Sequence, residues 1–278
     1  MNFLTAVLLG VIEGVTEFLP VSSTGHLTVA EKLLGLPVDE PGVTAFTAII
    51  QVGAILAVIL YFRRDIGRLA AAFFRGLVNR DARQEHDYRF AWYVIAGSVP
   101  IGIVGFLLRD VVSGPLRNLW IVVAGLIGWS VVMAIAERVA SRKRPEESLT
   151  LRDALVIGVL QCVALIPGVS RSGATISAGL FRGLDRVAAT RISFFLAIPA
   201  LVAAGAYEGL SQASAVSDSV GWGPTLLATV VSFAVAYVSI AWLLRLVSRH
   251  SITVFIWYRV ALGLLVAALL ATGVVAAT

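Results

Sequence analysis

The chain has 278 residues, of which 58% are apolar and 14% are charged, and its mean hydropathy is +0.90. A water-soluble core cannot bury this much apolar surface, so the composition excludes a soluble globular protein and predicts a single membrane domain, 1–278. The net charge of +5 is modest and the Arg residues are not interleaved with aromatic residues, which argues against nucleic acid as a partner, while the single cysteine excludes an intrachain disulfide.

The first segment, Met1–Leu36, is apolar but is interrupted by Glu13, Glu17 and Pro20. No basic residue precedes its apolar run, so we expect it to remain in the mature protein rather than to act as a signal peptide. It is not an ordinary membrane span either. Non-helical backbone at membrane depth needs protein or water to satisfy its N–H and C=O groups, so the segment is predicted to form a re-entrant helical hairpin.

Six later segments are long and apolar enough to cross a bilayer, because about 20 helical residues span the hydrocarbon layer. They are Thr44–Phe62, Ala91–Leu108, Leu119–Ala136, Ile192–Glu208, Gly223–Leu244 and Ile252–Thr272. Between the third and fourth lies Asp153–Leu184, which is broken by Pro, Gly and Ser and predicts a second re-entrant hairpin. The expected fold is therefore an all-α integral membrane protein with six transmembrane helices and two re-entrant hairpins.

Basic residues are distributed unevenly over the predicted topology. Most of the 22 Lys and Arg residues lie in the connections on one side, at 63–89, 138–152, 182–191 and 245–249. Cytoplasmic connections are enriched in Lys and Arg, so this side is predicted to face the cytoplasm. Both ends of the chain are then expected on the opposite, external side.

The two interrupted segments contain an internal repeat. Residues 10–25 align without gaps onto residues 158–173, with identities at Gly10/Gly158, Val11/Val159, Val15/Val163, Val21/Val169, Ser22/Ser170 and Gly25/Gly173. Three predicted spans, an odd number, separate the copies, so the hairpins should enter the membrane from opposite sides. This is an inverted-topology repeat, with copies at about 1–137 and 150–278, and such repeats bring broken helices together at one polar site.

Glu13 and Glu17 lie four residues apart and therefore share one face of a helix. Two carboxylates this close repel each other at membrane depth, so one would be protonated or the pair would bind a divalent cation. Hard oxygen ligands suit Mg²⁺ or Ca²⁺, and we expect a metal site at both residues. The alternative is that the hairpin is shallow and one Glu caps a helix.

Directly after these carboxylates, the sequence PVSSTGH at 20–26 places three hydroxyls and a histidine in one short break. Ser22, Ser23, Thr24 and His26 together can bind and cleave a phosphate ester, because a serine nucleophile needs a neighbouring base. Helix capping by the hydroxyls and a neutral histidine bonded to backbone carbonyls are the structural alternatives.

In the second copy, the sequence PGVSRSGAT at 167–175 places Arg171 opposite Ser23 of the first copy. A guanidinium binds phosphate through a planar pair of donors, and Ser170, Ser172 and Thr175 add hydroxyls around it. We therefore predict an anion site here, with a structural ion pair to Glu13 or Glu17 as the alternative role of the arginine. The segment does not have the pattern of a nucleotide-binding P-loop.

Together, EGVTEFLPVSSTGH at 13–26 and PGVSRSGATI at 167–176 resemble the motifs of the undecaprenyl-diphosphate phosphatase family, also called bacitracin-resistance proteins. The resemblance extends over essentially the whole chain, including QVGAILAV at 51–58. It implies a bacterial plasma-membrane enzyme that hydrolyses undecaprenyl diphosphate to undecaprenyl phosphate and phosphate, which recycles the carrier lipid for peptidoglycan synthesis. It also implies a divalent cation and a site open to the external face.

Carried over by position, the two-glutamate motif of the family falls on Glu13 and Glu17, its hydroxyl segment on 22–26, and its diphosphate-binding arginine on Arg171. In the resulting hypothesis the arginine, the hydroxyls and the cation bind the diphosphate, Ser23 attacks the terminal phosphorus, and His26 or Glu17 transfers protons. Attack by His26 or by water remains an alternative.

Two other classes remain open. A secondary transporter or polyprenyl-phosphate flippase is one, because inverted repeats with broken helices are common in transporters. The phosphatidate-phosphatase superfamily is the other, although its lysine-arginine-proline motif and second motif histidine are missing here. Besides the lipid substrate and membrane lipids, a second copy of the chain is a possible partner.

Overall fold

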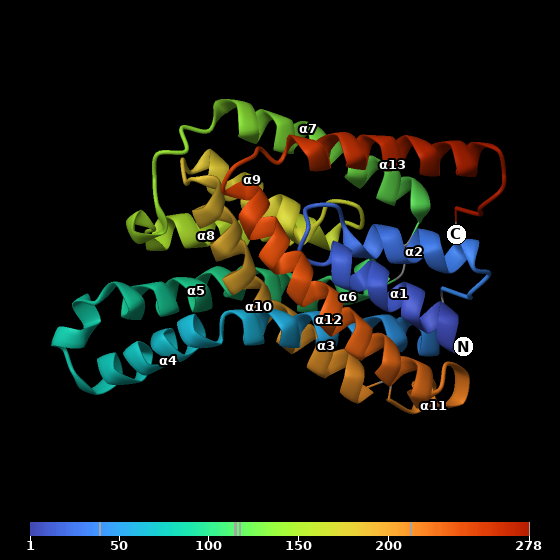
Figure 1. The fold of residues 1–278 in the computed structure, drawn as a ribbon, viewed down its shortest axis with the longest axis horizontal. Helices are drawn as coiled ribbons and strands as arrows, with labels where there is room; N and C mark the ends of the chain where they lie inside the picture. Colours follow the sequence, from blue (N-terminus) through green and yellow to red (C-terminus); the bar gives the residue numbers. More distant parts are fainter. Residues whose placement is uncertain (39, 114–115, 117, 212, 278) are drawn as a thin grey trace.

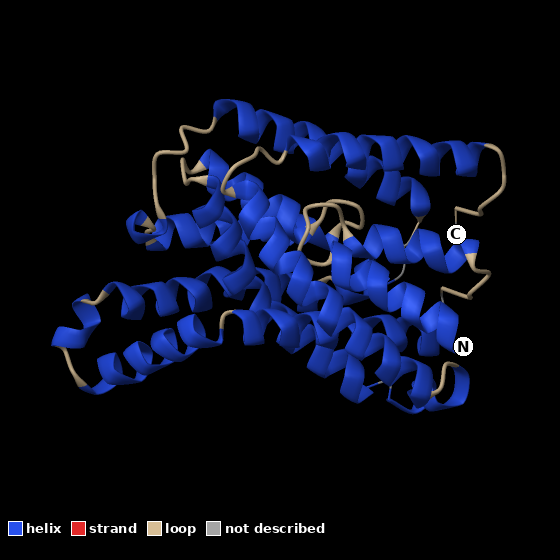
Figure 2. Ribbon diagram, viewed as in Figure 1, coloured by secondary structure: helices blue, strands red, loops and turns tan. Residues whose placement is uncertain are grey.

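The computed structural model describes residues 1–38, 40–113, 116, 118–211 and 213–277 (Figure 1). Their regular structure is helical (Figure 2). The one exception is an isolated β-bridge between Arg144 and Leu184. The α-helices are α1 Phe3–Thr16, α2 Ser23–Leu33, α3 Pro41–Tyr61, α4 Arg63–Val78, α5 His86–Leu107, α6 Arg109–Ser113, α7 Leu119–Val139, α8 Leu151–Gln161, α9 Arg171–Phe181, α10 Arg186–Ser211, α11 Ala213–Ser219, α12 Trp222–Val247 and α13 Thr253–Ala271, and short 3₁₀ helices cover Asp81–Gln84, Glu146–Ser148 and Cys162–Leu165.

Six of the described helices are long and apolar enough to cross a membrane, namely α3, α5, α7, α10, α12 and α13. They coincide with the six predicted spans, so the all-α membrane fold is confirmed. The predicted ends are wrong by a few residues, most at α10, which begins at Arg186 rather than at Ile192. Hydropathy falls where the arginines begin, whereas helical hydrogen bonding continues through them.

The two segments predicted as hairpins each form two short α-helices separated by a break in the α-helix, and the second break contains the 3₁₀ helix Cys162–Leu165. In the first, residues 17–22 separate α1 from α2, and in the second, residues 162–170 separate α8 from α9. These helices have 11 to 14 residues, so each is about 16–21 Å long and too short to cross a bilayer alone. Their entry into a membrane, the inverted repeat and the single-domain division stay predictions.

Close helix packing holds both breaks inside the protein. Helix α1 packs on α12 and α8 packs on α5. A Cβ atom at Gly10 would collide with the backbone of Ala228, and one at Gly158 would collide with the backbone of Gly97. Small residues allow helices to approach this closely in membrane proteins. Each copy of the sequence repeat is thereby packed against a span from the other half of the chain.

The connection between the first two spans, expected to be a loop, contains α4. This helix runs beside the first part of α5 (Figure 1). The ring of Phe73 packs against those of Tyr88 and Trp92. The alternation of Arg with Leu, Ala and Phe at helical spacing gives α4 one apolar face, and the hydropathy criterion for spans does not detect such a helix.

An ion-pair cluster ties the start of α8 to the end of α9. Asp153 is buried and accepts hydrogen bonds from Arg144 and Arg182 at 2.6 Å each, and its backbone and side chain form a capping box with Thr150. Burial acts to raise the pKa of the Asp153 carboxyl, but the hydrogen bonds from Arg144, Arg182 and Thr150 outweigh burial and hold this pKa far below its usual range. Asp153 therefore stays ionised and fixes the outer ends of the second pair of short helices.

Candidate active site

A cavity of about 200 Å³ lies where the two breaks meet. It is bounded by α3, α10 and the end of α5 in addition to the two helix-break-helix segments. Its polar lining residues are Glu17, Ser22, Ser23, Thr24, Gln51, Gln161, Ser170 and Arg171. Its apolar lining residues are Ile101, Ala164, Leu165, Pro167, Ala200, Leu201 and Ala204. A cavity of this composition suits a ligand with both a charged and an apolar part.

Glu17 contacts three of the other polar residues that line the cavity. One of its carboxylate oxygens, Oε2, accepts hydrogen bonds from Ser23 Oγ at 2.7 Å and from Gln51 Nε2 at 3.2 Å. The other, Oε1, is 3.1 Å from an Nη of Arg171. The sequence predicts that Glu17, Ser23 and Arg171 share a site, and the structure brings them together. Gln51 on α3 also contacts the carboxylate, although no motif in the sequence indicates this role.

Ser22 and Ser170 cap the helices that begin at the cavity. Their φ angles are 75° and 74°, a left-handed conformation that is uncommon for residues other than glycine. Each serine Oγ accepts a hydrogen bond from the backbone N–H three residues later, that of Gly25 or Gly173. The N-termini of α2 and α9 therefore both face the cavity, where their partial positive charges favour a bound anion.

Arg171 contacts residues from both halves of the chain. Its two Nη atoms donate to the carboxylate of Glu17 and to the carbonyl oxygen of Ser193, and its guanidinium lies over the ring of Phe18. The structural ion pair considered as an alternative is thus present. Arg171 nevertheless lines the cavity, and its buried Nε has no hydrogen-bond partner among the described residues.

The other hydroxyls of the second motif divide into two groups. Ser170 lines the cavity, whereas Ser172 and Thr175 are fully buried. Ser172 Oγ donates to the carbonyl oxygen of Leu19 at 2.8 Å, and Thr175 Oγ1 donates to Ser193 Oγ at 2.6 Å. Ser172 and Thr175 therefore hold the second break against the first break and α10 in this structure.

His26 does not contact the hydroxyl of Ser23. Its Nδ1 is 2.7 Å from the carbonyl oxygen of Ser22, and its Nε2 is 2.7 Å from the hydroxyl of Tyr258 on α13, whose ring stacks on the imidazole. Since a carbonyl can only accept, Nδ1 carries the proton, and in the neutral ring Nε2 accepts the Tyr258 proton. The base nearest to Ser23 is therefore Glu17.

Glu13 is buried, and its Oε1 has no hydrogen-bond partner among the described residues. The described residues contain no group of three or more His, Cys, Asp or Glu side chains placed to hold a metal. Mg²⁺ is commonly held by one or two carboxylates together with phosphate oxygens of a substrate, rather than by protein ligands alone. Glu17 lines the cavity, whereas Glu13 is not among the lining residues, so the two carboxylates fit a cation only in this shared form.

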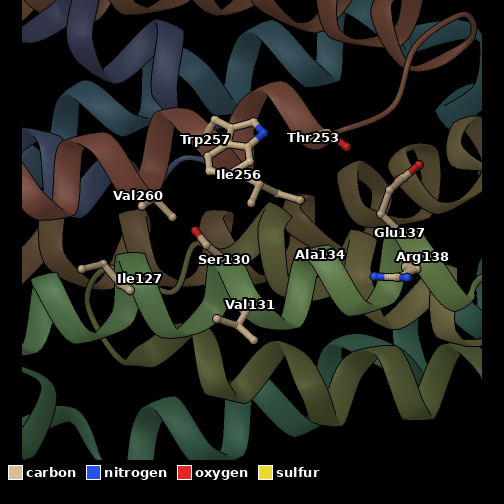
Figure 3. A pocket seen from close by; sticks show the side chains of 10 residues that line it. All are labelled: Ile127, Ser130, Val131, Ala134, Glu137, Arg138, Thr253, Ile256, Trp257 and Val260. Atoms are coloured by element: carbon tan, nitrogen blue, oxygen red, sulfur yellow. The ribbon is translucent and has the colours of Figure 1, made fainter.

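A larger groove of about 500 Å³ lies between α7 and α13, away from these residues (Figure 3). Its lining is apolar except for Ser130, Thr253, Glu137 and Arg138. The carboxylate of Glu137 is already paired with Arg142 and Arg186. The groove lacks a nucleophile with a neighbouring base, so the smaller cavity is the candidate active site.

The comparisons with known proteins agree with this geometry. The family model "Bacitracin resistance protein BacA" matches residues 6–265. Proteins named undecaprenyl-diphosphatase from Frankia casuarinae, Acidothermus cellulolyticus and Cutibacterium acnes are 61%, 58% and 54% identical to this chain, and in each case the alignment covers at least 99% of both chains. The resemblance seen in the two motifs is confirmed, and the chain belongs to the bacitracin resistance protein BacA family.

Proposed function

We propose that this membrane protein hydrolyses undecaprenyl diphosphate to undecaprenyl phosphate and inorganic phosphate, and so recycles the carrier lipid for peptidoglycan synthesis. Family membership and the names of the full-length relatives support this substrate. The family name indicates that the protein also contributes to bacitracin resistance. The observation that carries the proposal is the convergence of Ser23, Glu17 and Arg171 on one cavity that is also lined by apolar residues.

In the proposed reaction the diphosphate lies on Arg171 and on the N-termini of α2 and α9, and the first part of the lipid contacts the apolar residues of the cavity. Ser23 Oγ attacks the terminal phosphorus as its proton passes to Glu17, with which it already shares a 2.7 Å hydrogen bond. The bond between phosphorus and the bridging oxygen breaks, and undecaprenyl phosphate leaves. Water then hydrolyses the phosphoserine and releases phosphate.

A carrier built on the same architecture is the second candidate function. Transport requires a binding site with alternating access but does not require a nucleophile bonded to a base. The 2.7 Å contact between Ser23 and Glu17 therefore favours the phosphatase. Phosphate release by the purified protein distinguishes the two, because a flippase returns its lipid unchanged.

Arg171→Ala should lower the rate of phosphate release from undecaprenyl diphosphate by about 1,000-fold, because it removes the positive charge that stabilises the phosphoryl group in the transition state. The measurement is phosphate release in detergent, with thermal unfolding as the test of folding. The matched control is Arg245→Ala, an exposed arginine near the end of α12, which should behave like the wild type. Undiminished turnover by folded Arg171→Ala would contradict the site.

Rapid acid quenching with substrate labelled at the terminal phosphorus should trap phosphate on Ser23, located by mass spectrometry of the digested protein. Phosphoserine survives acid, whereas phosphohistidine survives alkali, so parallel quenches separate the two nucleophiles. Ser23→Ala should show no label, and the control Ser251→Ala should be labelled like the wild type. Label on His26, or no covalent label on either residue, would rule out the serine scheme and favour attack by histidine or water.

A divalent cation, Mg²⁺ or Ca²⁺, completes the proposal, with Glu13 and Glu17 as its protein ligands. The unpartnered Oε1 of buried Glu13 supports this assignment. When bound, the ion neutralises charge on the diphosphate oxygens. The structure assigns no reaction step to it.

Removal of the cation with a chelator should abolish phosphate release, and added Mg²⁺ or Ca²⁺ should restore it. Glu13→Gln should raise the cation concentration needed for half-maximal activity by at least about tenfold, because one charged ligand is lost. Glu147→Gln, an exposed carboxylate outside the six spans, is the control. Full activity of the wild type in excess chelator would exclude the cation.

The proposed enzyme lies in the bacterial plasma membrane with its cavity open to the external face. The basic connections in and after α4, around 138–152 and after α12 support this orientation, since such connections are retained in the cytoplasm. Both chain ends lie at the end of the molecule opposite α4 (Figure 1). The short helices of the two repeat copies would then enter the membrane from opposite sides. A homodimer stays a prediction.

Labelling of single cysteines tests the orientation. In a Cys162→Ser background, Thr24→Cys lines the cavity and should react with a membrane-impermeant maleimide applied to intact bacteria. Glu147→Cys, in the 138–152 connection, should react only after permeabilisation. The reverse pattern would place the cavity on the cytoplasmic side.

A further inference from the structure

Arg259 lies in the first half of α13 and is completely buried. Its Nε donates to Ser130 Oγ at 3.1 Å. Its two Nη atoms donate to backbone carbonyl oxygens of Pro20, Gly125, Leu126 and Gly168, at distances between 2.8 and 3.3 Å. No carboxylate among the described residues lies within ion-pair distance of it. An arginine inside a membrane span without a counter-charge is costly, which points to a function.

Two of these acceptors occupy the same position in the two copies of the sequence repeat. Pro20 in the first copy corresponds to Gly168 in the second, because the alignment offset is constant. Arg259 therefore binds equivalent carbonyls of the two breaks, Nη1 at 3.2 Å to Pro20 and Nη2 at 2.8 Å to Gly168. One rigid planar group joins the breaks at matching points.

Both contacts lie close to the reacting groups. Pro20 and Gly168 each precede by two residues the serine that caps the following helix, and Ser23 and Arg171 come directly after those caps. Gly168 has a φ of 92°, and a Cβ there would collide with the carbonyl of Val122 on α7, so this break has little room to shift. The position of Ser23 relative to Arg171 is thereby set through Arg259.

The residue before Arg259 acts on the same break. The hydroxyl of Tyr258 is 2.7 Å from His26 Nε2, and the other ring nitrogen of His26 binds the carbonyl of Ser22. One turn of α13 thus holds the first break on both sides of its capping serine.

We propose that Arg259 is a positioning residue of the phosphatase site, which holds the two breaks in register so that Ser23 and Glu17 from one copy face Arg171 from the other. This inference rests on the proposed function. Lysine cannot replace Arg259, because one ammonium group cannot reach both Pro20 and Gly168 with the fixed geometry of a guanidinium. The side chain touches no substrate and acts through the backbone.

The test compares Arg259→Lys with the wild type in detergent, with Arg245→Lys on α12 as the matched control and thermal unfolding as the test of folding. A displacement of the reacting groups by about 1 Å costs on the order of 100-fold in rate, so kcat of Arg259→Lys should fall by about 100-fold. KM should change by less than about threefold, since Arg171 still binds the diphosphate. A large fall in kcat with a nearly constant KM would not result from a merely structural role. Arg245→Lys should have wild-type values.

Combination with Arg171→Lys provides a second measurement. If both residues act on one arrangement, the double variant should lose less activity than the product of the two single losses. Folded Arg259→Lys with wild-type kcat, or fully multiplicative losses, would overturn the inference.

If Arg259→Lys does not fold, Ser130→Ala decides instead: loss of its bond to Arg259 should lower kcat by about fivefold, and a wild-type kcat would overturn the inference. Inactive wild type would refute the proposed function itself.

Discussion

Every broken helix leaves backbone groups without helical partners, and inside a membrane protein these groups must find partners within the protein. The site depends on one constraint: the free backbone N–H and C=O groups of the two breaks need hydrogen-bond partners within the protein. Serine caps bind the first N–H groups of α2 and α9, Ser172 binds the carbonyl of Leu19, and Arg259 binds carbonyls in both breaks. The bonds of Ser172 and Arg259 also run between the two copies, so the groups that stabilise each break also join it to the other.

The buried pair of Glu17 and Arg171 gives this scaffold its chemistry. Removing two charges from water is expensive, and their attraction offsets that cost only when the remaining donors and acceptors are also bonded. Ser23 and Gln51 donate the remaining hydrogen bonds to the carboxylate of Glu17, whereas Nε of Arg171 has no partner in the part of the chain that the structure describes. Under the proposed function, an entering diphosphate competes with Glu17 for the guanidinium. Glu17 then becomes free to accept the proton of Ser23 at the moment when the substrate is in place.

The parts of this arrangement that follow local rules could be predicted from the sequence. Hydropathy predicts the six spans, and Pro, Gly and Ser predict the breaks. The repeat predicts that Glu17 and Arg171 converge, although they are 154 residues apart. The contacts of Gln51, Ser193 and Tyr258 could not be predicted, because they depend on the rotation of long helices about their axes, which hydropathy does not fix. Arg259 carried a signal, a charge within an apolar span, but nothing in the sequence identifies its partners.

Differences between the two copies of the sequence repeat correspond to the asymmetry of the proposed reaction. Phosphoryl transfer needs a nucleophile with its base on one side of the phosphorus and positive charge around the phosphoryl oxygens. At equivalent positions the first copy has Glu17 and Ser23, and the second has Leu165 and Arg171. The elements that shape the breaks, Ser22 and Ser170 with their matching φ angles, are retained in both copies. The two breaks thus share the backbone conformation of their capping serines, while their side chains differ where the chemistry requires opposite charges.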